Sequence, residues 1–250
     1  MVGIVLTPDW FLGKDVLIEA FSFIVLAIFS VLAVKNYRLN RNRNFLYIGI
    51  GFTLIAIAQL ATILTKLVLY YDFGPSQAIG QALVTSGTVS SVDFFYSIGF
   101  FFHRFLTLLG VYIIYRLPRA KKSAWDYVLV AYFIVISAFI TNNVANIFHL
   151  TAFIILLLIV GKYHNVYLKN NFLNTRILLF AFGILAFSQL LFIFSGMVNT
   201  LDVVGNLFEL ISYTILLGLV IRILKHGKKK KSYGHHLRYV GDNPGKRRKH

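Results

Sequence analysis

Hydrophobic residues run in seven long blocks along the chain, and each block is separated from the next by a shorter polar or charged stretch. A helix needs about 20 apolar residues to cross the hydrocarbon core of a bilayer, and the blocks are of about that length. We expect spans at about 16–34, 45–70, 94–115, 125–140, 144–160, 177–198 and 204–224. The blocks lack the strict alternation of barrel strands, so the pattern predicts an all-α, polytopic membrane protein with seven transmembrane helices.

Basic residues fall on one side of these spans. They gather between spans one and two, three and four, and five and six, and beyond span seven, whereas the other connections hold almost none. The positive-inside rule therefore predicts an outer N-terminus, a cytoplasmic C-terminus and a multi-pass protein of the cell membrane. We expect two regions: a transmembrane bundle over 1–225 and a basic, disordered cytoplasmic tail over 226–250. A polar stretch at 72–93 is expected to form the longest loop.

Composition narrows the possible functions. The chain is 58% hydrophobic and 14% charged, and it contains no cysteine, which excludes disulfides, iron–sulfur clusters, thiolate zinc sites and cysteine nucleophiles. The net charge of +16 follows from the basic loops and tail, so it does not require a nucleic-acid-binding domain. No HExxH or GxSxG motif is present, and span seven has no central lysine for a retinal Schiff base. We therefore expect neither an enzyme nor a metal site.

Two stretches, 52–63 and 182–193, align without a gap and share Phe, Ala, Gln, Leu and Ile at matching positions. The same offset pairs Tyr37 with Tyr167 and sets Glu19 opposite His149. Two readings remain: an internal duplication, or two unrelated hydrophobic helices that each carry a glutamine. A duplication would give two parallel three-helix units joined by span four. This layout is similar to the three-plus-one-plus-three arrangement of SWEET-type transporters, although the Pro-Gln motif of their PQ-loop relatives is absent.

Polar residues inside the spans are the candidate site residues, because charged and amide groups are costly in lipid. Nearly all of them fall in the outer half of the predicted bundle. The candidates are Glu19, Gln59, His103, Arg104, His149, Gln189 and Glu209. The pattern favours an outward-facing polar pocket for a small ligand, in which Glu19, Arg104 and Glu209 form ion pairs. For the glutamines, the alternative is interhelical hydrogen bonding that only holds the bundle together.

His103 and His149 lie on different spans and raise the possibility of a haem held by two histidines. A second histidine pair is missing from the spans, and a haem would need the two rings to face each other. The sequence therefore disfavours a haem, and no other cofactor is expected.

The tail carries two basic runs, which are Lys228, Lys229, Lys230 and Lys231, and Lys246, Arg247, Arg248 and Lys249. Lysines next to a membrane hold topology and attract anionic lipid headgroups. The alternative is a docking segment for an acidic cytoplasmic protein, or for a ribosome or other RNA.

The segment 208–225 resembles the last span of the seven-helix sensory input regions of prokaryotic histidine kinases. That resemblance implies a sensory, receptor-like or scaffold module, but no kinase domain follows the segment in this sequence. Such a module would pass its signal to another protein through the tail. The alternative function is a small-solute transporter built on the parallel repeat.

Overall fold

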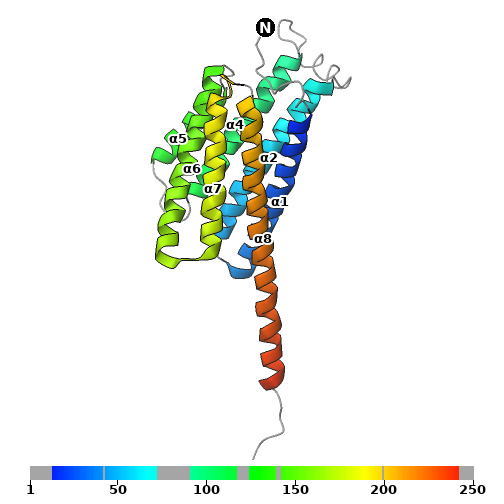
Figure 1. Ribbon diagram of the computed structural model, residues 1–250, viewed down its shortest axis with the longest axis vertical. Coiled ribbons are helices and arrows are strands. Elements are labelled where there is room, and N and C mark those ends of the chain that lie inside the picture. The colour runs from blue at the N-terminus through cyan, green and yellow to red at the C-terminus, as the bar shows by residue number, and fades with distance from the viewer. Residues whose placement is uncertain are drawn as a thin grey trace, which may run out of the picture.

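The described part of the chain folds into a bundle of seven helices (Figure 1). The computed structural model describes residues 13–41, 43–71, 91–116, 124–138, 142–198 and 200–241, and within these ranges it contains no strand. The helices are α1 (Lys14–Asn40), α2 (Arg43–Tyr71), α4 (Ser91–Arg116), α5 (Ala124–Ala138), α6 (Asn142–Asn170), α7 (Leu173–Phe194) and α8 (Thr200–Gly241). The predicted all-α membrane fold is confirmed. Most of the loop predicted at 72–93 lies outside the described residues.

Six of the helices are long and apolar enough to cross a membrane. The fourth predicted span is the exception, because α5 has 15 residues and a length of about 22 Å. That is less than the roughly 30 Å of a typical hydrocarbon core. The residues that would lengthen α5, 139–141, lie outside the described part of the chain.

The outer surface of the bundle is apolar. On α1, Ile24, Ile28 and Val31 follow one face at helical spacing and are 53%, 41% and 66% exposed. Similar exposed apolar residues occur on each of the remaining described helices, for example Leu157 on α6 and Phe180 on α7. An apolar surface of this extent would cause aggregation in water, whereas in a bilayer it faces lipid.

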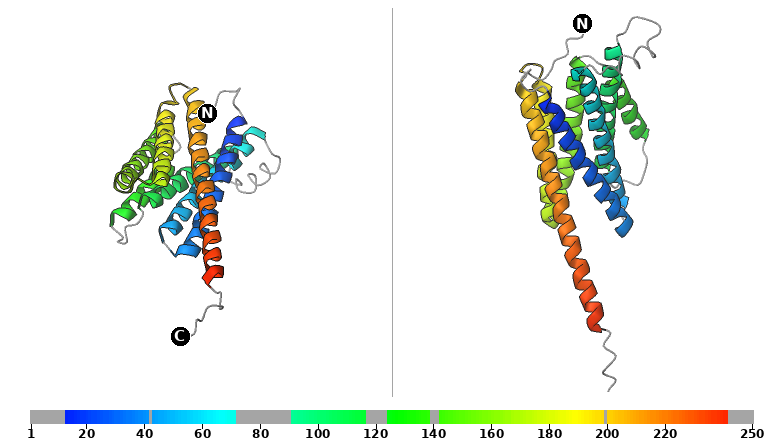
Figure 2. Two further views of the ribbon diagram at one scale, coloured as in Figure 1. Left: turned by 60° about the horizontal axis from the view of Figure 1, so that its bottom comes forward. Right: turned by 90° about the vertical axis from the view of Figure 1, so that its right-hand side faces the viewer.

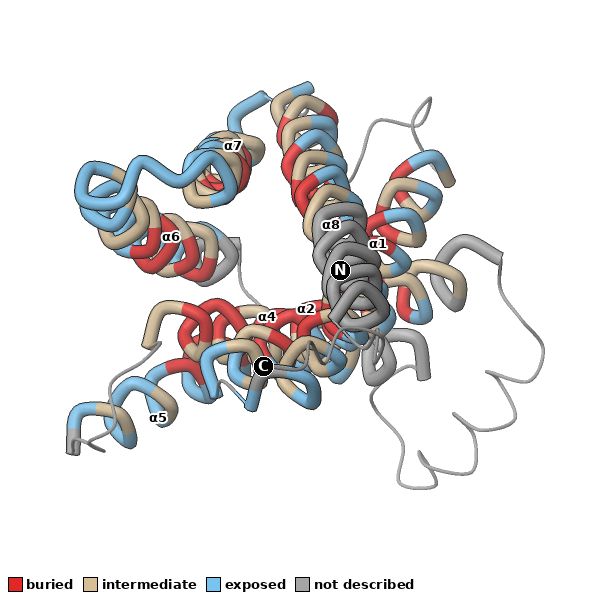
Figure 3. Tube along the Cα trace, turned by 90° about the horizontal axis from the view of Figure 1, so that it is seen from below, coloured by how far each residue is buried: buried red, intermediate tan, exposed pale blue. Residues whose placement is uncertain are grey.

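The helices pack in two groups of three. In the first group α2 lies between α1 and α4, and in the second α7 lies between α6 and α8. The groups meet where α1 packs on α8 and where α4 packs on α6, while α5 packs on the outside of α4 (Figures 2 and 3). Each group therefore places its first helix against the third helix of the other group.

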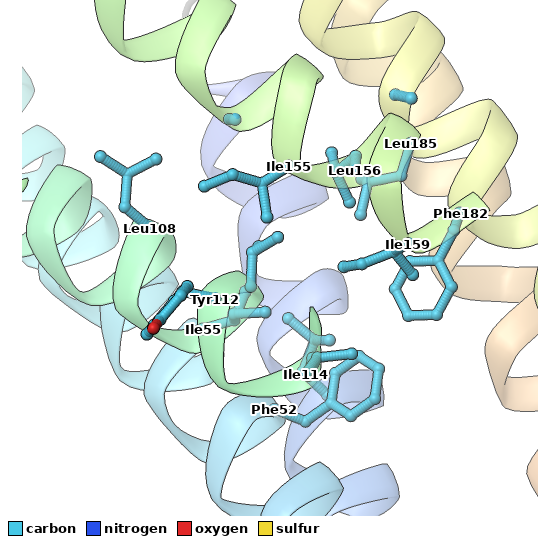
Figure 4. Packing of buried hydrophobic residues seen from close by; sticks show 14 of the residues in the cluster. Phe52, Ile55, Leu108, Tyr112, Ile114, Ile155, Leu156, Ile159, Phe182 and Leu185 are labelled. Carbon is cyan, nitrogen blue, oxygen red and sulfur yellow. The ribbon is translucent and has the colours of Figure 1, made fainter. Parts of the chain in front are cut away.

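A single hydrophobic core fills the space between the two groups. Figure 4 shows Phe52 and Ile55 of α2, Ile159 of α6 and Phe182 of α7 pointing toward one another. The rings of Phe52 and Phe182 stack with centroids 6.4 Å apart, and Tyr163 stacks on Phe182 at 5.9 Å. Aromatic rings thus join α2, α7 and α6 across the middle of the bundle.

The turns that follow α1 and α6 have the same backbone geometry. Arg41 and Asn171 lie 130 positions apart, and their φ angles are 52° and 46°. The Arg41 N–H donates to Tyr37 O at 2.8 Å, and the Asn171 N–H donates to Tyr167 O at 2.7 Å. Each residue closes its helix in a left-handed conformation, and the next helix starts two residues later.

Both turns lie at one end of the bundle, which we call the basic end, and α8 leaves the bundle at this end (Figure 1). The opposite end, where α1 and α8 begin, we call the acidic end. Helix α8 has 42 residues, or about 63 Å, of which Thr200–Ile223 is apolar enough to span a membrane. Its remaining 224–241 continue as a helix for about 27 Å, where the sequence analysis expects a disordered tail. Lysine is a good helix former, so a helix already started in the membrane can extend through this run.

Candidate functional site

The strongest polar contact inside the bundle joins α1 to α2 near the acidic end. Asp15 and Glu19 are one helical turn apart, so both carboxylates lie on the same face of α1. Lys66 Nζ of α2 donates to Asp15 Oδ2 at 2.7 Å and to Glu19 Oε1 at 2.6 Å. The Asp15 side chain is fully buried, and those of Glu19 and Lys66 are 11% and 15% exposed. Charges this deeply buried are held in place because separating them leaves an uncompensated ion.

A second contact joins α2 to α8. Glu209 Oε1 accepts hydrogen bonds from Gln59 Nε2 at 3.0 Å and from the Tyr213 hydroxyl at 2.8 Å. Gln59 and Lys66 are seven residues apart on α2 and therefore share a face. Glu209 also lies within electrostatic range of Glu19 and Lys66. The two contacts form one polar network, the α1–α2–α8 cluster, which comprises Asp15, Glu19, Gln59, Lys66, Glu209 and Tyr213.

The α1–α2–α8 cluster contains more carboxyl groups than basic groups. Asp15, Glu19 and Glu209 face one ammonium, that of Lys66, and Asp202 lies within electrostatic range of the same lysine. Glu19 Oε2 is buried and has no hydrogen-bond partner among the residues that the structure describes. A buried carboxylate oxygen of this kind is a costly group, so the cluster is sensitive to any change in its charge.

The remaining candidates gather on the other side of the bundle, around α4, α6 and α7. His149 Nδ1 donates to Gln189 Oε1 at 2.9 Å, and its ring lies 5.1 Å from that of Phe192. His103 Nδ1 donates to the carbonyl of Ala58 at 3.3 Å. The buried Arg104 guanidinium lies 6.0 Å from the centre of the Phe148 ring. This group of His103, Arg104, Phe148, His149 and Gln189 is called the histidine cluster below.

The seven predicted site residues thus fall into two groups. Glu19, Gln59 and Glu209 belong to the α1–α2–α8 cluster, while His103, Arg104, His149 and Gln189 belong to the histidine cluster. The two groups adjoin, because His103 lies within electrostatic range of Lys66. Glu19 takes Lys66 as its ion-pair partner, where the sequence analysis expects Arg104.

The sequence analysis does not include Asp15, Lys66 and Tyr213 among the site residues. The sequence does contain features that could have identified Asp15 and Lys66. Asp15 stands one turn before Glu19, and Lys66 is a cation within an apolar span. Of the predicted tail residues, Lys228, Lys229, Lys230 and Lys231 lie on the extension of α8. The second basic run, 246–249, lies outside the described residues.

Two observations bear on metal and histidine chemistry in the two clusters. Within the described ranges, no three His, Asp or Glu side chains are grouped so that they could hold a metal ion. The His103 and His149 rings both contact Phe148, with centroid distances of 6.0 and 4.8 Å. The acidic and basic side chains of the two clusters can bind a charged or polar group, or bind and release protons, within a low-dielectric bundle.

A cavity among the described residues lies away from both clusters. It has a volume of about 450 Å³, and it runs along α7 toward the basic end. Its lining is formed by Val160, His164, Leu179, Phe180, Gly183, Ile184, Phe187 and Phe208. Comparisons with protein families, with curated proteins and with solved structures find no match for this chain.

Proposed function

We propose that this integral membrane protein is a receptor-like sensory module of the cell membrane, without catalytic activity of its own. In this proposal a change of charge at the α1–α2–α8 cluster alters the position of α8. The observation that carries it is that α8 contributes Glu209 and Tyr213 to that cluster and continues as a single helix to Gly241, beyond the basic end (Figure 1).

The contacts of Glu209 support this coupling. Its carboxylate binds Gln59 of α2, and Gln59 shares a helix face with Lys66, which holds α1. A ligand that binds here, or displaces one of these partners, changes the contacts between α8 and the other two helices. Helix shifts of about 1–2 Å are a common form of signal in membrane and allosteric proteins.

The proposed output is the basic extension of α8. Its lysines would contact an acidic cytoplasmic partner, a ribosome or other RNA, or anionic lipid. Capture of cytoplasmic partners by the full chain and by a chain without 226–250 tests this step. A partner that binds both chains equally well would remove the extension from the proposal.

Distance measurements between two spin labels test the coupling directly. The chain contains no cysteine, so cysteines introduced at Asn171 and Ser232 give two unique labels. Glu209→Ala removes the carboxylate oxygen that accepts the Gln59 hydrogen bond between α2 and α8, and we expect the distance distribution to shift by about 1–2 Å. Thr214→Ala is the matched control, because Thr214 bonds only its own helix, at Leu210 O. An unchanged distribution in the Glu209→Ala protein would contradict the proposal.

A small-solute transporter is the second candidate, and a specific observation favours it. The turns at Arg41 and Asn171 share geometry at the same 130-residue offset as the aligned stretches, and each three-helix group packs its first helix on the other's third. This is the arrangement expected of two duplicated parallel units. Solute flux into proteoliposomes tests it: flux that Gln59→Ala and Gln189→Ala both abolish would replace the sensory proposal.

A further inference from the structure

We propose that the groove along α7 at the basic end binds one acyl chain of an anionic phospholipid, whose headgroup is held by Arg176 and His164. This inference is independent of the sensory function and of the basic tail. It rests on the shape of the groove, on its position within the membrane span, and on the basic side chains at one of its ends.

The groove is lined by carbon. Phe180, Gly183, Ile184 and Phe187 follow one face of α7 at helical spacing. Gly183 deepens the groove, since a Cβ at this position would meet no atom within 4 Å. A volume of about 450 Å³ whose wall is apolar apart from His164 has few partners for water and is suited to a hydrocarbon chain.

The two ends of the groove differ. Toward the membrane centre it is closed by Phe187 and Phe208, whose rings meet edge to face at 5.0 Å. At the basic end His164 forms part of its wall, and the Arg176 guanidinium lies 5.7 Å from the centre of the Phe180 ring. The groove therefore has a hydrocarbon body with the Arg176 cation at its opening, which complements the tail and headgroup of an anionic lipid.

The distance from Arg176 to the closed end of the groove matches one leaflet. Arg176 and Phe187 are 11 residues apart on α7, or about 16 Å along the helix axis. Half of a typical hydrocarbon core is about 15 Å. A partner transmembrane helix would need a free face across both leaflets, whereas this groove stops near the membrane centre. The occupant that fits is a lipid of the leaflet at the basic end.

Native mass spectrometry of the purified full chain tests the proposal. The protein is first equilibrated with vesicles of equal phosphatidylglycerol and phosphatidylcholine and then extracted, and a chain without 226–250 is treated in the same way to account for lipids held by the tail charges. We expect one retained phosphatidylglycerol. Gly183→Leu fills the groove and should lower retention at least fivefold. Gly161→Leu is the matched control, because Gly161 also faces open space but lies outside the groove.

A second pair of variants tests the headgroup. Arg176→Gln should lower the preference for phosphatidylglycerol over phosphatidylcholine about fivefold, the value expected for one basic residue near the surface. Arg38→Gln, at the same end but on α1, should leave the preference unchanged. Undiminished lipid in a correctly folded Gly183→Leu protein would overturn the proposal, as would equal retention of both lipids. A dimer of this chain that Gly183→Leu abolishes, without retained lipid, would show that a helix occupies the groove instead.

Discussion

The ion pairs of Lys66 give the sharpest prediction for stability. Lys66→Met keeps the length and apolar bulk of the side chain but removes the ammonium that binds Asp15 and Glu19 at 2.7 and 2.6 Å. Both carboxylates then stay inside the bundle without their cation. The change also removes the charged contact between α1 and α2 in the half of the bundle nearest the acidic end.

The size of the effect follows from burial. Removing one member of a buried ion pair costs about 3–5 kcal/mol, because the other charge is left uncompensated. Asp15 is fully buried, but Lys66 is 15% exposed and Glu19 11%, so some water reaches the site. That exposure favours the lower part of the range, and we expect the free energy of unfolding to fall by about 3 kcal/mol.

Reversible unfolding in mixed detergent micelles measures this loss. Lys35→Met is the control, since Lys35 is exposed on α1. Adding Asp15→Asn and Glu19→Gln to Lys66→Met should recover most of the lost stability, because neutral amides replace the uncompensated carboxylates. The reasoning is refuted if Lys66→Met and Lys35→Met unfold with the same free energy, or if the triple variant is no more stable than Lys66→Met alone.

Two further changes test the packing of α4. A Cβ at Gly110 would lie 2.7 Å from Gly51 O of α2, so Gly110→Ala should cost about 1–3 kcal/mol of stability, seen as a lower melting temperature. In Gly161→Ala the new Cβ would meet no atom within 4 Å, so the melting temperature should fall little or not at all. Equal melting temperatures for the two variants would contradict the close approach of α2 and α4. Asp126→Ala removes the 2.6 Å ion pair with Arg116 and should increase hydrogen exchange in α5 while the other helices stay protected. Unchanged exchange in α5 would show that this ion pair does not hold α5 on α4.

The helices were predictable because each depends on its own stretch of chain. A block of apolar residues must form a helix in lipid, since its backbone groups can find partners only within the segment. The geometry of the turns at Arg41 and Asn171 was not predicted, although the two turns lie at the same 130-residue offset as the aligned stretches and the pair Tyr37 and Tyr167. A prediction that depends on one stretch of chain alone does not depend on how the helices pack.

The partners of the buried polar groups could not be predicted in the same way. A sequence shows that Glu19 needs a counter-ion, but it does not show which helix lies beside α1. Arg104 and Lys66 were both available, and the packing of α1 on α2 selects Lys66. Arg104 lies on α4, on the far side of α2, and its guanidinium is placed over Phe148 of α6. Such choices depend on helix neighbours, and therefore on the whole fold.

The bounds of α5 and α8 compare differently with those predicted. Apolar composition marked 125–140 as a span, and α5 covers Ala124–Ala138 and packs on one side of α4 through Asp126. For α8, the lysine run suggested disorder because of its charge, whereas a helix that is already formed extends with little nucleation cost.

The sidedness of the two ends tests the central claim most directly, because the sensory proposal needs the α1–α2–α8 cluster to face outward and the α8 extension to face the cytoplasm. A single cysteine in place of Met197, which is 82% exposed at the acidic end, should react with a membrane-impermeant maleimide in intact cells. A single cysteine in place of Asn171, at the basic end, should react only after the membrane is opened. Reaction of both positions from the same side, or of Asn171 alone in intact cells, would contradict the account.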